Sequence, residues 1–414
     1  MQHYKYVIIG GGIAGTTAGE TIRACDPDGK IAIVSDEPHN CYSRVLLSKP
    51  KWVLGEQPFE NVWLKNDAWY LEKKIDLFKG IRATALDAGK KKITLSDGDA
   101  LTYEKLLLAT GAHSRKWTVQ GAEKKGVHYL RTLDDAKRLN EVAQGAPKRV
   151  VMVGSACVSF EIIEILHERG FDITEVMREK YFFEPQLSRE EVAPIEKTLE
   201  EKGIKIIREM EIEEVLGGAE VSGVRLSDGR ELQCDVILAF IGVELPVEWI
   251  KNAGVAVHKG IYANQHLETN VPDIWTAGDT AEGWDVMLEE TVIMGNWMSA
   301  RLQGEVAGKN MTGAREVYEQ VSFHSSHGFG YNIGWAGDVR PVVQGKERVV
   351  VHIPTDKAGT HCRILLSDGR VVGGTTVNRQ DLMGVITSLI KGKKDISDSL
   401  EGLQSGAIDI ASLK

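Results

Sequence analysis

A glycine-rich turn near the start of the chain constrains its fold more than any other feature. Residues 7–15 read VIIGGGIAG, a short apolar run followed by a glycine turn and the start of a helical pattern. Gly10, Gly12 and Gly15 fit the spacing G-x-G-x-x-G, in which the first glycine allows a tight turn, the second lets a pyrophosphate approach the backbone, and the third lets helix and strand pack closely. The free N–H groups at the start of such a helix attract phosphate. The stretch therefore predicts a dinucleotide site in an α/β domain.

The residues that follow favour this interpretation over a purely structural turn. Residues 30–35 (KIAIVS) have the pattern of a second buried strand, and Asp36 and Glu37 come directly after it. An acidic side chain at the end of this strand accepts hydrogen bonds from a ribose. Either Asp36 or Glu37 can fill that role.

A second unit of the same kind begins at residue 147. Residues 147–154 (PKRVVMVG) form an apolar run that ends in glycine, apolar residues at helical spacing continue to Gly170, and residues 171–176 (FDITEV) have the pattern of another strand. A chain of 414 residues is also too long for one ordinary core. Two nucleotide-type units predict either two bound dinucleotides or one dinucleotide and a degenerate copy.

Charge, apolar runs and cysteines argue against several classes of protein. The net charge of −9, with no run of like charges, argues against nucleic acid or an anionic membrane as the main partner, and residues 236–243, the longest later apolar run, are too short to span a bilayer. Five scattered cysteines without a C-x-x-C pair argue against a disulfide framework or a metal site, and they fit a reducing cytoplasm. His324 and His327, predicted on one helical face, have no acid or cysteine cluster beside them, so we expect structural histidines and no metal.

Three further stretches carry residues suited to a cofactor. Residues 41–49 (CYSRVLLSK) place Arg44 and Lys49 beyond the first unit, where each can bind phosphate or flavin or remain solvated. An apolar run ends at residues 109–111 (ATG), whose small side chains allow a close backbone approach. A later strand ends at Asp279, whose carboxylate can accept hydrogen bonds from a sugar alcohol, although Gly-Asp also forms ordinary turns.

Taken in order, these motifs resemble those of the two-dinucleotide-binding flavoproteins, the FAD-dependent pyridine nucleotide oxidoreductases. The similarity is closest to rubredoxin and ferredoxin reductases, apoptosis-inducing factor and the flavin region of assimilatory nitrite reductase, and it covers nearly the whole chain. The resemblance implies an α/β fold with two interleaved Rossmann-type domains, for FAD and NAD(P), and a small C-terminal α+β domain. The implied boundaries are residues 1–115 and 246–315 for FAD, 116–245 for NAD(P), and 316–414 for the C-terminal domain.

The resemblance also implies roles for individual residues. It places the FAD pyrophosphate on the first glycine turn, the ribityl chain on Asp279, and a catalytic ion pair between Lys49 and Glu161 beside the flavin N5. The cofactor-binding residues that it implies are Gly10, Gly12, Ala14, Gly15, Asp36, Glu37, Arg44, Lys49, Ala83, Ala109, Thr110, Gly111, Arg115, Gly154, Ser155, Gly278, Asp279 and Trp297.

The second glycine turn departs from the family pattern. Ala156 and Ser159 stand where the second and third glycines are expected, and each adds a side chain near the path of a nicotinamide pyrophosphate. Met177 and Arg178 occupy the expected place of the ribose acid, and Arg178 can either accept a 2′-phosphate or stay solvated. We therefore predict weak but real nicotinamide binding.

The chain also lacks the paired redox cysteines of disulfide reductases. Cys41 lies a few residues upstream of the place where single-cysteine relatives have theirs, and Val45 is closer to that place. We expect Cys41 to be a buried, inert thiol.

The resemblance implies an FAD-dependent NAD(P)H:acceptor oxidoreductase. Its cofactor is FAD, and NAD(P)H is the co-substrate. The electrons pass to a small redox protein or a partner oxidoreductase subunit in the cytoplasm. The resemblance is compatible with an oligomer. The alternative is an FAD-carrying scaffold or interaction subunit whose nicotinamide site is degenerate. The sequence does not indicate the acceptor, the direction of the reaction or the choice between NADH and NADPH.

Overall fold

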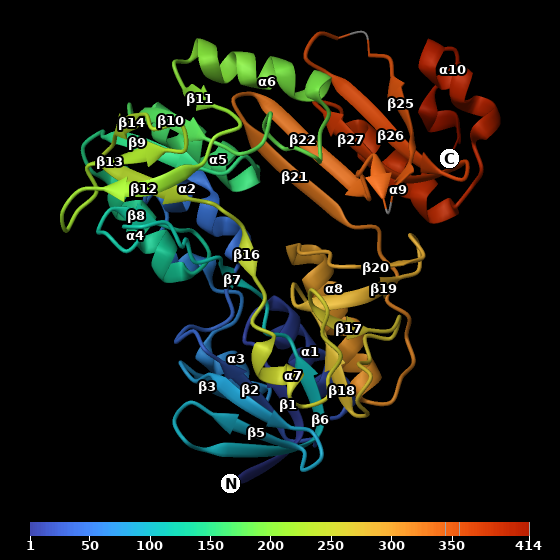
Figure 1. The fold of residues 1–414 in the computed structure, drawn as a ribbon. Coiled ribbons are helices and arrows are strands. Elements are labelled where there is room, and N and C mark those ends of the chain that lie inside the picture. Colours follow the sequence, from blue (N-terminus) through green and yellow to red (C-terminus); the bar gives the residue numbers. More distant parts are fainter. Residues whose placement is uncertain (344, 356, 414) are drawn as a thin grey trace. The chain divides into compact units, whose positions relative to one another are not determined.

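The computed structural model describes residues 1–343, 345–355 and 357–413, which divide into two compact units. Unit 1 comprises Met1–Val45, Phe59–His113 and Val243–Ser322. Unit 2 comprises Leu46–Pro58, Ser114–Gly242 and the described residues from Phe323 on. The chain passes from unit 1 to unit 2 within β7 (His113–Ser114) and returns to unit 1 at the start of β16 (Val243–Glu244) (Figure 1).

Unit 1 is built on a seven-stranded sheet in the order β3-β2-β1-β6-β5-β4, with β18 paired to β6. The first turn lies at the centre of this sheet, because β1 pairs in parallel with both β2 and β6. β2 is buried along its whole length, as expected for a parallel strand covered on both faces. The strands are β1 (Gln2–Ile9), β2 (Ile31–Ser35), β3 (Ile75–Lys79), β4 (Ala83–Asp87), β5 (Lys92–Leu95), β6 (Ala100–Leu108) and β18 (Ile274–Thr276), and a small sheet contains β17 (Ile261–Ala263), β19 (Ala281–Asp285) and β20 (Glu290–Val292).

Helices α1 and α8 of unit 1 lie backbone against backbone. A Cβ atom added to Gly304 would lie 2.2 Å from the Ala14 carbonyl oxygen, and one added to Gly308 would lie 2.9 Å from the Ala18 carbonyl oxygen. The small residues on one face of α8 therefore allow this close packing. The helical segments of unit 1 are α1 (Ile13–Cys25), α3 (Asp67–Glu72), α7 (Glu248–Lys251), α8 (Trp297–Met311) and the 3₁₀ turn η2 (Phe59–Val62), while η1 (Arg44–Ser48) spans the unit boundary.

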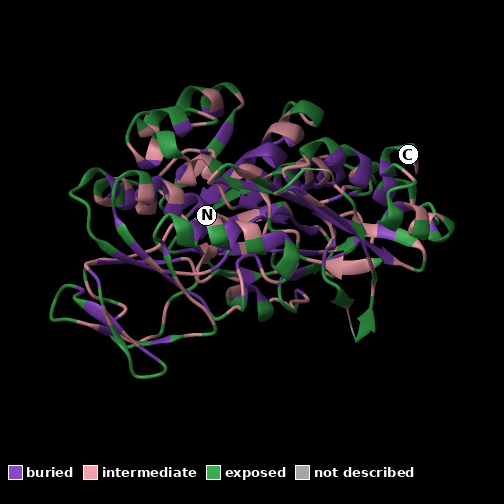
Figure 2. Ribbon diagram, turned by 90° about the horizontal axis from the view of Figure 1, so that it is seen from above, coloured by how far each residue is buried: buried purple, intermediate pink, exposed green. Residues whose placement is uncertain are grey.

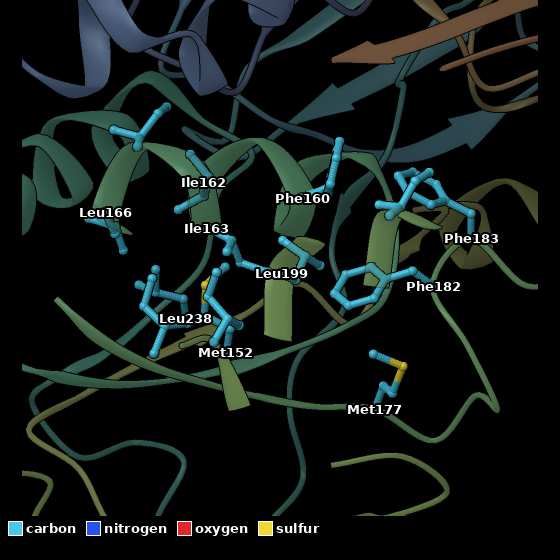
Figure 3. Close-up of a cluster of buried hydrophobic side chains, with 14 of the residues drawn as sticks. Met152, Phe160, Ile162, Ile163, Leu166, Met177, Phe182, Phe183, Leu199 and Leu238 are labelled. Atoms are coloured by element: carbon cyan, nitrogen blue, oxygen red, sulfur yellow. The ribbon is translucent and has the colours of Figure 1, made fainter. Parts of the chain in front are cut away.

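Unit 2 contains a second parallel sheet, in the order β11-β10-β9-β15-β8, and a small antiparallel sheet. Figure 3 shows the core that α5 forms with this sheet, where Ile163 faces Met152 and Leu238. The strands are β8 (Val127–His128), β9 (Arg149–Val153), β10 (Asp172–Val176), β11 (Lys205–Ile207), β12 (Ile212–Leu216), β13 (Gly223–Leu226), β14 (Glu231–Gln233) and β15 (Val236–Ala239), and the helices are α2 (Pro50–Val53), α4 (Leu133–Gln144), α5 (Cys157–Glu168) and α6 (Arg189–Glu201).

The C-terminal region is a five-stranded antiparallel sheet that belongs to unit 2. The turn of its first hairpin lies against α5, where a Cβ on Gly328 would come within 2.9 Å of the Phe160 ring. Arg363 also forms a buried ion pair with Glu191 of α6, at 3.3 Å. The elements are β21 (Phe323–Gly328), β22 (Tyr331–Gly337), β23 (Val342–Val343), β24 (Lys346–Glu347), β25 (Val349–Ile353), β26 (His361–Ser367), β27 (Arg370–Val377), α9 (Met383–Gly392), α10 (Leu400–Ser405) and the 3₁₀ turns η3 (Gln380–Leu382), η4 (Ser397–Ser399) and η5 (Ile410–Leu413).

Buried residues follow the sheets and the inner faces of the helices, whereas exposed residues gather in the connecting loops (Figure 2).

The prediction that His324 and His327 share a helical face is wrong, because both lie on strand β21, where residues three apart point to opposite faces. His324 stacks on Trp335 with ring centroids 5.1 Å apart, and burial lowers the pKa of His324. Among the described residues, no group of histidine, cysteine and acidic side chains could hold a metal, and no helix is long and apolar enough to cross a membrane.

Candidate active site

The first glycine turn leaves open space at only one of its three motif glycines. Gly10 has φ +123°, and a Cβ there would lie 1.9 Å from the Ala109 carbonyl oxygen, while a Cβ on Gly15 would lie 2.0 Å from the Gly10 carbonyl oxygen. These two glycines are required by the turn itself. Gly12, which caps the N-terminus of α1, has no atom within 4 Å of the position of an added Cβ. The turn is thus a cradle that a side chain at Gly12 would fill.

Two other strand ends meet this turn in unit 1. Ala277 N–H donates to the Leu108 carbonyl at 3.1 Å, and Thr110 is hydrogen-bonded to Thr280 at 3.3 Å, so the ends of β6 and β18 lie side by side. A Cβ on Gly278 would lie 3.1 Å from the Ala14 side chain. The structure therefore brings Ala14, Ala109, Thr110, Gly111, Gly278 and Asp279 to the same edge of the sheet as the first turn.

The start of α8 presents polar groups to the same region. Gly278 is close to Ala300 in the first turn of α8, at 3.8 Å from an added Cβ. The Asn296 side chain caps the helix by accepting from the Ser299 N–H at 2.8 Å. The buried Asn296 Nδ2 and Trp297 Nε1 find no hydrogen-bond partner within the described part of the chain. Unpaired buried donors are costly, so this helix end fits a ligand that carries acceptors, as an FAD ring edge does.

Of the two acids after β2, only Glu37 is held in a fixed orientation. Glu37 accepts from the Tyr42 hydroxyl at 2.7 Å and pairs with Arg44 at 2.7 Å. Burial acts to lower the pKa of Arg44, but Tyr42, Glu37 and Asp279 together raise it. Asp36 is more exposed and lies farther from its partners, 3.6 Å from Arg82.

Ala83 and Arg115, which the resemblance assigns to FAD binding, have surroundings that differ from those of the first glycine turn. Ala83 is buried in the apolar core of the unit 1 sheet. Arg115 belongs to unit 2, where its side chain is exposed and its N–H donates to the Gly242 carbonyl at 3.1 Å.

The structure brings Lys49 and Glu161 together. Lys49 Nζ lies 2.7 Å from each carboxylate oxygen of Glu161, and the Ser48 hydroxyl donates to Glu161 Oε2 at 2.7 Å. Ser326 of β21 donates to Oε1 at 3.3 Å. The side chains of Lys49 and Glu161 are 23% and 7% exposed, so the pair is largely shielded from water.

Lys49 lies on a segment that the predicted boundaries assign to the FAD domain but that packs with unit 2. The Asn140 side-chain amide donates to the carbonyls of Trp52 and Val53 at 3.0 and 2.9 Å, and Val53 is buried beside Leu139. These contacts attach residues 46–58 to α4. The division into contact units thus differs from the boundaries expected at residues 115 and 315.

The second glycine turn repeats the first with two changes. Gly154 has φ +129°, and a Cβ there would lie 2.4 Å from the Phe240 carbonyl oxygen, so this glycine is required as Gly10 is. Ala156 caps α5 and is exposed, and its methyl group stands where Gly12 leaves space. The Ser159 hydroxyl donates to the Gly154 carbonyl at 2.8 Å, which replaces the close approach seen at Gly15 with a hydrogen bond. Ser155, which lies between Gly154 and Ala156, is buried.

Strand register identifies an acid that the sequence pattern missed. Gly10 N–H donates to the Val34 carbonyl, and Gly154 N–H donates to the Val176 carbonyl, so Val34 and Val176 are counterparts. Counting three residues onward from each makes Glu179 the counterpart of Glu37. Sequence reasoning stopped at Arg178, whose exposed side chain lies 3.9 Å from Glu211. Counting from the glycines alone would not have found Glu179, because Glu37 lies 27 residues after Gly10 whereas Glu179 lies 25 residues after Gly154.

A fully buried carboxyl group, Glu175, lies in β10 next to this turn. Neither of its oxygens has a hydrogen-bond partner in the described structure. Burial, with a smaller contribution from Glu179, raises the pKa of Glu175 well above its ordinary value of 4.5. The group therefore stays protonated in the folded chain at pH values where the unfolded chain is ionised.

We expect Glu175→Gln to stabilise the protein at alkaline pH. A raised pKa in the folded state means that stability falls as pH rises from about 4.5 toward the folded-state pKa, by up to about 1.4 kcal/mol per pH unit. Glutamine has the same shape without the ionisation, so the variant should unfold at a higher temperature than wild type at pH 8.5 and at a similar temperature at pH 4.5. Thermal unfolding at both pH values tests this. The matched control is Glu213→Gln, an exposed glutamate, which should not change the pH dependence.

The cysteines are free thiols, and Cys41 is buried. Burial raises the pKa of Cys41 to about 11, so this thiol carries no thiolate at neutral pH. Val45 is exposed and offers no alternative nucleophile.

The chain belongs to the pyridine nucleotide-disulphide oxidoreductase family, whose model matches residues 4–304. It is similar to the ferredoxin–NAD(+) reductase component of the biphenyl dioxygenase system of Paraburkholderia xenovorans strain LB400, at 28% identity over 98% of both chains. It is also 29% identical to subunit epsilon of the NADH-dependent phenylglyoxylate dehydrogenase of Aromatoleum evansii, over 96% of this chain and 94% of that one. The solved ferredoxin reductase for the CYP199A2 system of Rhodopseudomonas palustris covers 99% of both chains at 25% identity, with a TM-score of 0.89.

These comparisons confirm the predicted family and the predicted α/β fold with Rossmann-type sheets and a C-terminal domain. They also confirm the class of an FAD-dependent oxidoreductase that uses NAD(P)H. The roles of single residues, by contrast, rest on the geometry above.

Proposed function

We propose that this protein takes electrons from NADH through FAD and passes them to a small redox protein. The arrangement that supports the proposal best is the first turn. There Gly12, alone among the three motif glycines, leaves open space, and two further strand ends and the start of α8 converge. Relatives whose names specify a ferredoxin reductase support the choice of acceptor. A partner oxidoreductase subunit is the second candidate acceptor, since one relative is a dehydrogenase subunit.

In this proposal the residues of unit 1 bind and orient FAD. The N–H groups at the start of α1 bind its pyrophosphate, Glu37 rather than Asp36 accepts from the adenosine ribose, and Asp279 accepts from the ribityl chain. Asn296 and Trp297 donate to acceptors on the ring. When bound, FAD supplies two-electron acceptance from a nicotinamide and release of single electrons to the acceptor.

Unit 2 binds the nicotinamide cofactor in the same proposal. The N-terminus of α5 faces the pyrophosphate, and Glu179 accepts from the adenine ribose, which favours NADH because a carboxylate repels a 2′-phosphate. The exposed Arg178 beside it is compatible with NADPH, so this choice is open to a direct test. The family resemblance implies that Lys49, which Glu161 orients within unit 2, would supply a positive charge that favours electron density on a bound flavin.

Anaerobic titration of the purified yellow protein with NADH and with NADPH tests the proposal. Stoichiometric bleaching of the flavin by NADH, at lower concentration than by NADPH, is the expected result. A flavin that neither nicotinamide reduces would contradict the proposal and favour the FAD-carrying scaffold instead. A cytoplasmic location is part of the proposal and fits the free thiols of the described chain.

We expect Ala156→Gly to tighten nicotinamide binding by about fivefold. The exposed methyl group of Ala156 stands where the first turn leaves space at Gly12, so its removal restores about one imperfect contact, worth ~1 kcal/mol. The Kd for NADH, measured by stopped-flow reduction, reports the change. Ser159→Gly is the contrasting variant: it removes the hydrogen bond to Gly154, so it should not improve affinity. An Ala156→Gly protein with unchanged Kd would contradict the expectation.

A further inference from the structure

Ser326 links the C-terminal sheet to the Lys49–Glu161 pair. Its hydroxyl donates to Glu161 Oε1 at 3.3 Å from a position 165 residues away in the chain, and the serine is only 3% exposed. The other two donors to Glu161, Ser48 and Lys49, are sequence neighbours on one segment. Ser326 therefore holds the carboxylate from a separate direction.

Strand β21 keeps this hydroxyl in place. Ser326 pairs with Ile333 in the β21–β22 ladder, and β21 lies against α5, the helix that carries Glu161. At the end of the strand, Phe329 N–H donates to the Glu164 carboxylate, and Gly328 lies so close to Phe160 that a side chain would clash. The backbone around Ser326 is thus attached to the same helix as its partner.

The carboxylate needs such donors because its last torsion is soft. Rotation about the terminal bond of a glutamate is broad and roughly two-fold, so Lys49 alone, 2.7 Å from both oxygens, does not select one plane. Ser48 on Oε2 and Ser326 on Oε1 together fix that plane. The orientation of Glu161 in turn sets the position of the Lys49 ammonium group.

We propose that Ser326 is a positioning residue of the reductase, which acts through Glu161 to fix Lys49. The inference rests on the proposed function, because the consequence for catalysis follows only if Lys49 acts on the flavin. It assigns to the C-terminal sheet a part in the chemistry of unit 2. Ser326 itself exchanges no proton or electron.

The first test is independent of activity. Lys49 in the full-length protein is acylated with a water-soluble N-hydroxysuccinimide ester, and the rate at that lysine is followed by mass spectrometry. Ser326→Ala should raise the rate about tenfold, the lower end of the effect expected when one hydrogen bond to a charged group is lost. Ser325→Ala is the matched control, since Ser325 is exposed on the opposite face of β21 and should leave the rate unchanged. Equal rates in both variants would overturn the proposal.

The second test separates positioning from general loosening of the fold. Flavin reduction by NADH is measured for wild type, Ser326→Ala, Glu161→Gln and the double variant. Ser326→Ala should slow reduction about tenfold on its own and add nothing to Glu161→Gln, because it acts through that carboxylate. If Ser326→Ala slows flavin reduction by the same factor in the Glu161→Gln protein as in wild type, the proposal is overturned. If wild type is not reduced by either nicotinamide, the proposed function fails, while the labelling rates still decide whether Ser326 positions Lys49.

Discussion

Replacing Gly12 with valine should yield a folded protein without flavin. Gly12 has φ −74° and ψ −170°, which valine adopts readily, and nothing lies within 4 Å of the added Cβ, so the chain itself accommodates the change. The valine side chain would instead occupy the space through which a pyrophosphate reaches the N–H groups of α1. Loss of one or two hydrogen bonds to a charged group costs about 3 kcal/mol, or about 100-fold in FAD affinity. The ratio of flavin to protein absorbance after purification measures the effect.

Gly10→Val provides the contrasting control. At this position a Cβ would collide with the Ala109 carbonyl oxygen, and φ is +123°, so valine should disrupt the turn and lower the unfolding temperature. Far-UV circular dichroism should therefore find Gly12→Val as well folded as wild type apoprotein and Gly10→Val less stable. A Gly12→Val protein that retains full flavin occupancy would show that the cofactor does not lie on this turn.

The fold was largely predictable because its strongest signals are local. The glycine turns at Gly10 and Gly154 and the apolar strands beside them specify parallel strands and helix starts within short windows of sequence. The histidines on β21 were misplaced because three-residue spacing alone does not distinguish a helix face from a strand. The predicted domain boundaries treat residues 1–115 as one block, whereas the attachment of residues 46–58 to unit 2 depends on Asn140, far away in the chain.

The site was predictable only in part, for a related reason. Family motifs pointed to Lys49 and Glu161, but the sequence contains no local signal that Ser326 would meet Glu161 across 165 residues. Glu179 was missed because its equivalence to Glu37 depends on strand register, which backbone hydrogen bonds set. Glu175 also escaped notice, since a glutamate in a strand pattern ordinarily faces water.

Breaking the Lys49–Glu161 pair should slow flavin reduction and lower the free energy of unfolding. The loss of stability should depend on which partner is removed. Lys49→Met leaves a carboxylate that is only 7% exposed with two hydroxyl donors, so we expect a loss of about 3 kcal/mol in the free energy of unfolding. Glu161→Gln leaves an ammonium group that is more exposed and can reach water, so its cost should be smaller. Both variants should slow flavin reduction by NADH about 10- to 100-fold, the value of one charged hydrogen bond in a transition state.

Stopped-flow reduction and chemical unfolding of the same preparations measure the two effects. Lys51→Met is the matched control, because Lys51 lies on the same segment, is exposed and should change neither quantity. Combining Lys49→Met with Glu161→Leu removes both charges, so the double variant should regain much of the stability lost in Lys49→Met while reduction stays slow. That separation of stability from rate is the decisive result, because a pair that serves only the fold would recover both together. Wild-type reduction rates in Lys49→Met would exclude the pair from catalysis.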